Sequence, residues 1–176
     1  MSFQEFKPTI LFLARFVGIY VLANILYGIY VTSYEPMVDP ATHSLTKQTA
    51  FILNTCGYRV DVMPRPSKPT ADILYLGKSK LAVYEGCNGI NTMIVFAAFL
   101  IAFGPSSKNL IWFTLVGFLI VHLANLARIT LLFLVSEHLP KAMYFTHKYF
   151  FTATLYVVIF TLWFWWVKAY SMNGKQ

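Results

Sequence analysis

Residues 9–31 read TILFLARFVGIYVLANILYGIYV, an almost unbroken apolar run that decides the class of this protein. Its strongly polar members are Arg15 and Asn24. About 20 consecutive apolar residues in a helix cross the hydrocarbon core of a bilayer. The run therefore predicts a membrane span at residues 9–31, and it is too long for the apolar core of a signal peptide.

The composition of the whole chain points the same way. Its 176 residues are 57% hydrophobic and only 12% charged, which is more apolar than an ordinary soluble domain. The 16 Phe, 11 Tyr and 4 Trp suit a bilayer, where Phe faces lipid and Tyr or Trp lies at the interfaces. The formal net charge of +7 is spread over loops and termini, so we expect membrane lipid and not nucleic acid as the surrounding partner.

Three further apolar segments, at residues 88–104, 109–135 and 148–168, predict three more spans. The expected fold is therefore an all-α integral membrane protein with about four transmembrane helices, forming a single membrane domain over residues 1–176. Basic residues near span ends mark the cytoplasmic side. With four spans the following basic residues share one side: Lys7, Arg15, Lys108, Lys168 and Lys175. Residues 32–86 and the short segment 136–147 are then expected outside the cytoplasm.

Residues 32–86 form the expected extracytoplasmic insert, because prolines and charged residues interrupt every apolar run in it. Leu45, Thr49, Ile52 and Cys56 recur at helical spacing before Gly57, which predicts a short amphipathic helix with Cys56 as a packing residue. Residues 72–76 and 80–84 are β-prone and flank residues 77–79, which predicts a β-hairpin that leads directly into the second span.

Three reactive side chains converge at one membrane level in this topology. Cys87 begins the second span from outside, Arg128 lies near the outer end of the third, and His147 begins the fourth. A guanidinium inside a lipid-facing helix costs roughly 2.5 kcal/mol or more unless it is paired or hydrated. Arg128 is therefore a candidate functional residue, and snorkelling of its side chain to the interface is the structural alternative.

Cys87 is the candidate nucleophile, because glycines flank it and a helix N-terminus with a nearby guanidinium lowers a thiol pKa. The alternatives are a buried packing cysteine or a disulfide with Cys56. His147 is the candidate acid or base, with His138 in the outer loop as its competitor.

Residues with supporting roles are Asn125, Asn91 and Glu85, which could orient Arg128 or the substrate. Asn125 and His122 could equally be interhelical hydrogen-bonding residues that hold a bundle together. The scattered histidines form no metal motif, so neither a metal nor another cofactor is expected.

With EGCNGI at residues 85–90, NLARI at 125–129 and FTH at 145–147, the sequence resembles the exosortase and archaeosortase family, and most closely its short exosortase F type. In that family a cysteine in a Cys-Ser-Gly-like turn, an arginine in an Asn-x-x-Arg-Ile segment and a later histidine form the proposed active site. Cys87, Arg128 and His147 match these in order, over a resemblance that covers residues 80–160. Asn88 stands where serine is usual, and about four spans replace the roughly eight of larger members.

The resemblance implies a membrane-embedded cysteine transpeptidase or protease of the bacterial cytoplasmic (inner) membrane. Its partners would be exported proteins with a C-terminal sorting signal: a short motif, a hydrophobic helix and a basic tail. Cleavage at the outer face would be followed by transfer to an acceptor, with Cys87 as nucleophile, Arg128 stabilising the oxyanion and His147 moving protons. The alternative functions are a non-catalytic scaffold and a small transporter. Neither the oligomeric state nor the acceptor follows from the sequence.

Overall fold

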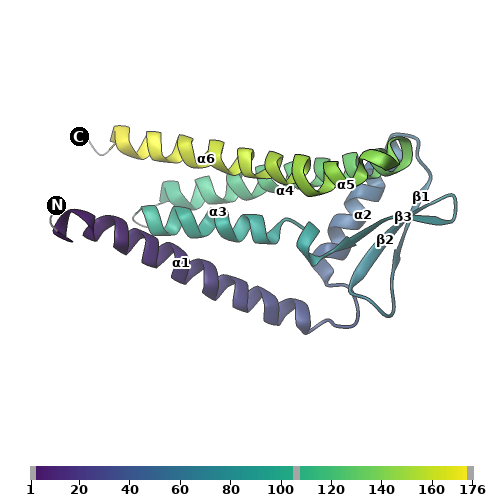
Figure 1. Cartoon of the computed structure of the whole chain (residues 1–176), viewed down its shortest axis with the longest axis horizontal. Coiled ribbons are helices and arrows are strands. Elements are labelled where there is room, and N and C mark those ends of the chain that lie inside the picture. The colour runs from purple at the N-terminus through teal and green to yellow at the C-terminus, as the bar shows by residue number, and fades with distance from the viewer. Residues whose placement is uncertain (1–2, 105–107, 174–176) are drawn as a thin grey trace.

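The computed structural model describes residues 3–104 and 108–173 as a bundle of long helices with a small sheet at one end (Figure 1). The long helices are α1 (Phe3–Thr32), α4 (Lys108–His138) and α6 (Phe151–Asn173), with the shorter α3 (Ile90–Phe103) among them. The start of α1 and the end of α6 lie at the end of the bundle opposite the sheet (Figure 1). The molecule therefore has a helical membrane part and a capping part made by the residues between α1 and α3.

Within the described residues, three helical segments are long and apolar enough to cross a membrane: Phe6–Thr32, Lys108–His138 and Pro140–Ala169. The chain is thus a multi-pass membrane protein. The remaining apolar helix, α3, has 14 residues, so its length is about 21 Å against a hydrocarbon core of about 30 Å. The expected span at 88–104 is therefore a shorter helix than predicted, and a count of four spans stays a prediction.

Aromatic packing and one glycine hold α3 between its neighbours. Phe96 of α3 is fully buried, and a Cβ added to Gly117 of α4 would lie 2.2 Å from its ring. Only a residue without a side chain lets α3 and α4 approach this closely. On the other sides, Phe99 stacks on Trp163 of α6 with ring centroids 4.2 Å apart, and Phe12 of α1 meets Phe99 edge-on.

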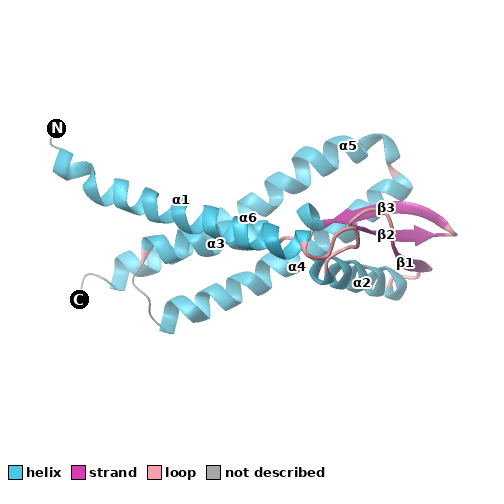
Figure 2. Cartoon of the chain, turned by 90° about the horizontal axis from the view of Figure 1, so that it is seen from below, coloured by secondary structure: helices cyan, strands magenta, loops and turns pink. Residues whose placement is uncertain are grey.

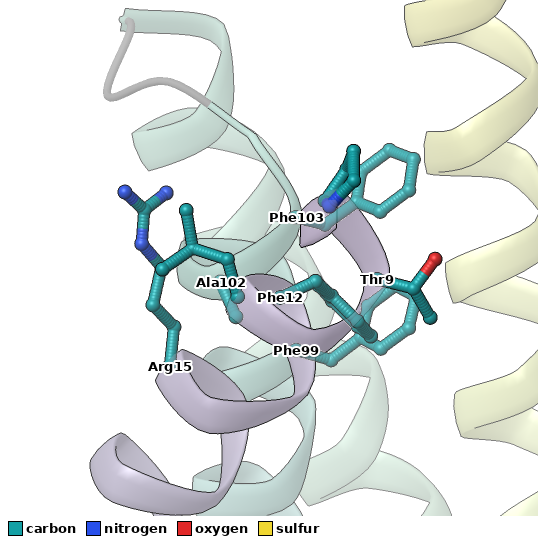
Figure 3. A pocket seen from close by; sticks show the side chains of 8 residues that line it. Thr9, Phe12, Arg15, Phe99, Ala102 and Phe103 are labelled. Carbon is teal, nitrogen blue, oxygen red and sulfur yellow. The ribbon is translucent and has the colours of Figure 1, made fainter. Parts of the chain in front are cut away.

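A hollow of about 500 Å³ lies between α1 and the end of α3 that is remote from Cys87 (Figure 3). Its wall includes the rings of Phe12, Phe99 and Phe103, and Arg15 borders it. Arg15 is exposed, and it does not belong to the polar groups around Cys87.

The short helix expected in the insert is present as α2 (Pro40–Thr55). Asp39 caps its N-terminus by accepting from the main-chain N–H groups of Ala41 and Thr42, each at 3.0 Å. Gly57 follows with a positive φ of 92°, as a glycine after a helix end should. The packing role predicted for Cys56 is wrong, because its side chain is exposed at the C-terminal cap. Cys56 and Cys87 are both free thiols.

The sheet has three antiparallel strands in the order β1 (Val60–Pro64), β2 (Thr70–Tyr75) and β3 (Lys78–Tyr84). The predicted hairpin exists, but its turn is Leu76–Gly77 and not residues 77–79, since Tyr75 pairs with Lys78. Both turn residues have positive φ, 50° and 74°, as a two-residue hairpin turn requires. The sequence reading missed β1, whose five residues show no clean alternation of buried and exposed positions.

One face of the sheet packs on α2 and α4 through a single apolar cluster that also contains Cys87. Fully buried members include Leu53 of α2, Ile73 of β2 and Phe133 of α4. Figure 2 shows α2 beside the sheet, with the strands lying alongside this helix. Because β3 runs directly into the residues that precede α3, this cluster fixes the position of the turn that carries Cys87.

Candidate active site

Cys87 ends a single 3₁₀ turn, Glu85–Cys87, between β3 and α3, and only 4% of its side chain is exposed. The chain then reverses at Gly89, which has a φ of 86°. A Cβ at Gly89 would lie 3.0 Å from the side-chain nitrogen of Asn125. Both the conformation and the space therefore require glycine, and the cysteine turn lies directly against α4.

Asn125 of α4 connects this turn to Arg128. The Asn125 amide is fully buried, and its Nδ2 donates to the main-chain oxygen of Cys87 at 2.8 Å. Nη1 of Arg128 in turn donates to Asn125 Oδ1 at 3.3 Å. The guanidinium is thus held next to the cysteine by a side chain one helical turn away, while its buried Nε has no hydrogen-bond partner among the described residues.

His147 is the histidine that reaches the thiol. Its Nε2 lies 3.9 Å from Cys87 Sγ. The residue belongs to a π-helical turn, Thr146–Phe150, which precedes α6; such turns are frequent at functional sites. Its competitor His138 has a different partner, since its Nε2 lies 2.8 Å from the Tyr58 hydroxyl.

A cavity of about 170 Å³ adjoins the turn, and Arg128 is one of its walls. Most of its other lining residues bring polar groups: Asn91, Thr92, Thr152 and Tyr156. Asn91, a predicted orienting residue, is therefore at the site. Within residues 3–104 and 108–173 the Glu85 carboxylate has no hydrogen-bond partner, and its main-chain oxygen accepts from the Tyr27 hydroxyl at 3.4 Å.

Burial sets the protonation of the thiol. It raises the pKa of Cys87 above its ordinary value, while the nearby Arg128 guanidinium and hydrogen bonds from Tyr84 act in the opposite direction with smaller effect. The expectation of a lowered thiol pKa is therefore wrong for this state of the protein, because the turn is covered by α4 and by the segment that carries His147. The raised pKa favours the protonated form of the Cys87 thiol.

The sequence reading missed a hydrogen-bond network around Asn88, which is 4% exposed. Its Nδ2 donates to the hydroxyls of Tyr27 at 2.7 Å and Thr42 at 3.0 Å. Its Oδ1 accepts from the main-chain N–H of Ile90 at 2.9 Å, and the Thr42 hydroxyl also donates to Asp39. The network joins α1 and α2 to the cysteine turn. The departure from serine at residue 88 was its only signal in the sequence.

His122 lies outside the site. Its Nε2 contacts Oε1 of Gln48 at 2.8 Å and thereby links α4 to α2. Across residues 3–104 and 108–173, no three His, Cys, Asp or Glu side chains gather as metal ligands would.

A buried thiol, an imidazole and a guanidinium at one end of a bundle of membrane helices define a multi-pass membrane protein with a cysteine–histidine–arginine site. The model of the transmembrane exosortase family (Exosortase_EpsH) matches residues 6–166. The chain belongs to this family. No curated protein and no solved structure matches it.

Proposed function

We propose that this protein is a membrane-embedded cysteine transpeptidase or protease of the short exosortase F type. It would cleave the C-terminal sorting signal of exported proteins at the outer face of the bacterial cytoplasmic membrane and transfer them to an acceptor. The observation that carries the proposal is the 3.9 Å separation of Cys87 Sγ and His147 Nε2, with Arg128 held beside the same turn through Asn125. Membership of the exosortase family supports it.

The first half-reaction follows from the raised pKa of the buried Cys87 thiol. His147 Nε2 removes the thiol proton as sulfur attacks the scissile carbonyl carbon, and the carbonyl oxygen becomes an oxyanion. Arg128 stabilises that oxyanion, since a fixed cation is most effective where water is excluded. When the carbon–nitrogen bond breaks, His147 returns the proton to the departing amine, which leaves a thioester on Cys87.

The second half-reaction reverses these roles. An incoming amine or water loses its proton to His147 as it attacks the thioester, and Cys87 leaves as the thiol. The cavity lined by Arg128, Asn91 and Tyr156 adjoins the cysteine turn and provides space for one reacting group. Asn125 and Asn91 orient Arg128 and the substrate, whereas Glu85 contributes negative charge near the thiol.

The length of α4 supports a site at the outer membrane surface. It begins at Lys108, and the axial distance from there to Arg128 is about 30 Å at about 1.5 Å per residue. That distance equals the thickness of the hydrocarbon core. With Lys108 at the cytoplasmic surface, as the distribution of basic residues predicts, Arg128 reaches the other surface.

The proposal is tested by following the mass of an exported protein with such a C-terminal signal in cells. The variants are Cys87→Ala, Arg128→Gln and His147→Ala, with Cys56→Ala as the matched control. Cys87→Ala should abolish processing and Cys56→Ala should preserve it. Normal processing by Cys87→Ala would overturn the proposal. Labelling of Cys87 in intact cells by a membrane-impermeant thiol reagent, with Cys56 removed, tests the outer location separately.

A non-catalytic scaffold is the second candidate. It is favoured by the contact of His122 with Gln48 of α2 and by that of Asn125 with the main chain at Cys87, which hold separate elements together. It predicts that Cys87→Ser, which keeps the shape of the side chain, leaves function intact. The catalytic proposal predicts a loss, because a serine hydroxyl is a far weaker nucleophile than a thiol in the same site.

A further inference from the structure

The two edges of the small sheet differ in how their main-chain groups are occupied. On the β1 edge, the Val60 N–H donates to Asn54 Oδ1 at 2.9 Å and the Val60 oxygen accepts from Asn54 Nδ2 at 3.1 Å. The strand ends at Pro64, which has no N–H to offer. Protein sheets commonly block an edge with such devices, because an open edge pairs with other chains. The β1 edge is therefore blocked at both of its ends, at Val60 and at Pro64.

The main-chain groups on the β3 edge can be assigned from the register. The Thr70 oxygen accepts from the Arg65 N–H at 3.0 Å, so Thr70 directs its main-chain groups toward β1. Its partner on β3 is Tyr84, and Asp72, two residues after Thr70, pairs with Ala82. When a residue of the middle strand directs its main-chain groups toward one neighbouring strand, its partner on the other neighbouring strand directs its own main-chain groups away from the middle strand. Ala82 and Tyr84 thus direct their N–H and C=O groups to the free edge of β3.

This edge is open and it ends at the nucleophile. Among the described residues, no main-chain hydrogen bond joins β3 to any segment other than β2, and Ala82 and Tyr84 are both exposed. Figure 2 shows β3 at the margin of the sheet, with β2 between it and β1. The turn that carries Cys87 begins directly after Tyr84, so the free edge at Ala82 lies just before the cysteine turn.

We propose that an extended segment of the exported substrate pairs with the free edge of β3 as a fourth strand, in parallel orientation, and is thereby guided to Cys87. The chain of β3 continues toward the membrane as α3. The substrate segment likewise continues toward the membrane as its own hydrophobic helix, so the two strands have the same chain direction. Main-chain pairing of this kind supplies affinity without demanding a particular side chain. The inference rests on the proposed function and adds how the substrate is held.

The test uses the full-length protein in bilayer nanodiscs and a synthetic peptide covering the sorting region of an exported protein from the same bacterium. Ala82→Pro removes the outward N–H of β3, while Ala82→Val keeps it and suits a strand. Ala82→Pro should raise KM about tenfold, the value of one or two main-chain hydrogen bonds, with kcat little changed. Ala82→Val should behave as wild type. Equal KM values for the two variants would overturn the inference.

A second measurement leaves the protein unaltered, which matters if Ala82→Pro folds poorly. Peptides with a single N-methylated main-chain nitrogen are compared at successive positions before the membrane helix. Loss of affinity at alternate positions supports strand pairing, because alternate residues of a strand face the same neighbour. A uniform effect, or none, overturns it. Failure of the proposed function is distinguishable, since the unmethylated peptide would then also remain uncleaved by wild-type protein.

Discussion

Replacing Asn88 should disable the cysteine turn in graded steps. Asn88→Ala removes three hydrogen bonds that its side chain makes with Tyr27, Thr42 and the main chain of Ile90. Asn88→Ser introduces the serine that usually follows the cysteine in the exosortase family. A serine oxygen two residues before Ile90 can still accept from its N–H, as in an ordinary turn, but it is too short to reach the two hydroxyls.

The magnitudes follow from the count of lost hydrogen bonds. Each contributes about 1 kcal/mol net to stability, so Asn88→Ala should cost about 3 kcal/mol and Asn88→Ser about 2 kcal/mol. Asn88 is only 4% exposed, and its hydrogen bonds join two helices to the turn. Losing them should therefore displace Cys87 as well as lower the stability. Processing should decrease in the order wild type, Asn88→Ser, Asn88→Ala.

The assay combines the processing rate with the thermal midpoint of the purified protein and the rate of Cys87 alkylation. Asn24→Ala is the matched control, because among the described residues the Asn24 amide bonds only the Tyr20 main-chain oxygen of its own helix. Asn88→Ala should lower the midpoint and the processing rate, whereas Asn24→Ala should change neither. The reasoning is refuted if Asn88→Ala matches wild type, or if Asn88→Ser is as damaging as Asn88→Ala.

Three further outcomes are expected. Because burial raises the pKa of the Cys87 thiol, alkylation should be slow at pH 7 and should accelerate as pH rises through and beyond the ordinary thiol range. Arg128→Gln should shift that pH profile to still higher pH, and an unchanged profile would show that Arg128 does not affect the pKa of Cys87. His147→Ala should reduce the processing rate by about 10²- to 10⁴-fold, whereas His138→Ala, which lacks contact with the thiol, should leave it within a few-fold of wild type; a reversed ranking in rate measurements would reassign the base. Gly117→Ala should destabilise the bundle by about 1–3 kcal/mol through overpacking, seen as a lower thermal midpoint, and a midpoint equal to wild type would show that the facing ring moves freely.

The membrane class of the protein was readable from the sequence because lipid imposes a simple requirement. A helix that crosses a bilayer needs a long apolar run, and residues 9–31, 109–135 and 148–168 supply such runs independently of any contact. The predicted order of the spans also placed Cys87, Arg128 and His147 at one membrane level, independently of any distance.

Tertiary contacts decided the rest. A thiol pKa depends on the atoms that cover it, so the sequence suggested an activated Cys87 whereas burial raises its pKa. The strand β1 likewise depends on its pairing with β2, for example of Val60 with Tyr75, and the position of the hairpin turn depends on the register of β2 and β3. Asn88 shows the same limit, since its partners lie on α1 and α2. The local sequence names the reactive groups, but only long-range packing determines which of them touch and in which protonation state they meet.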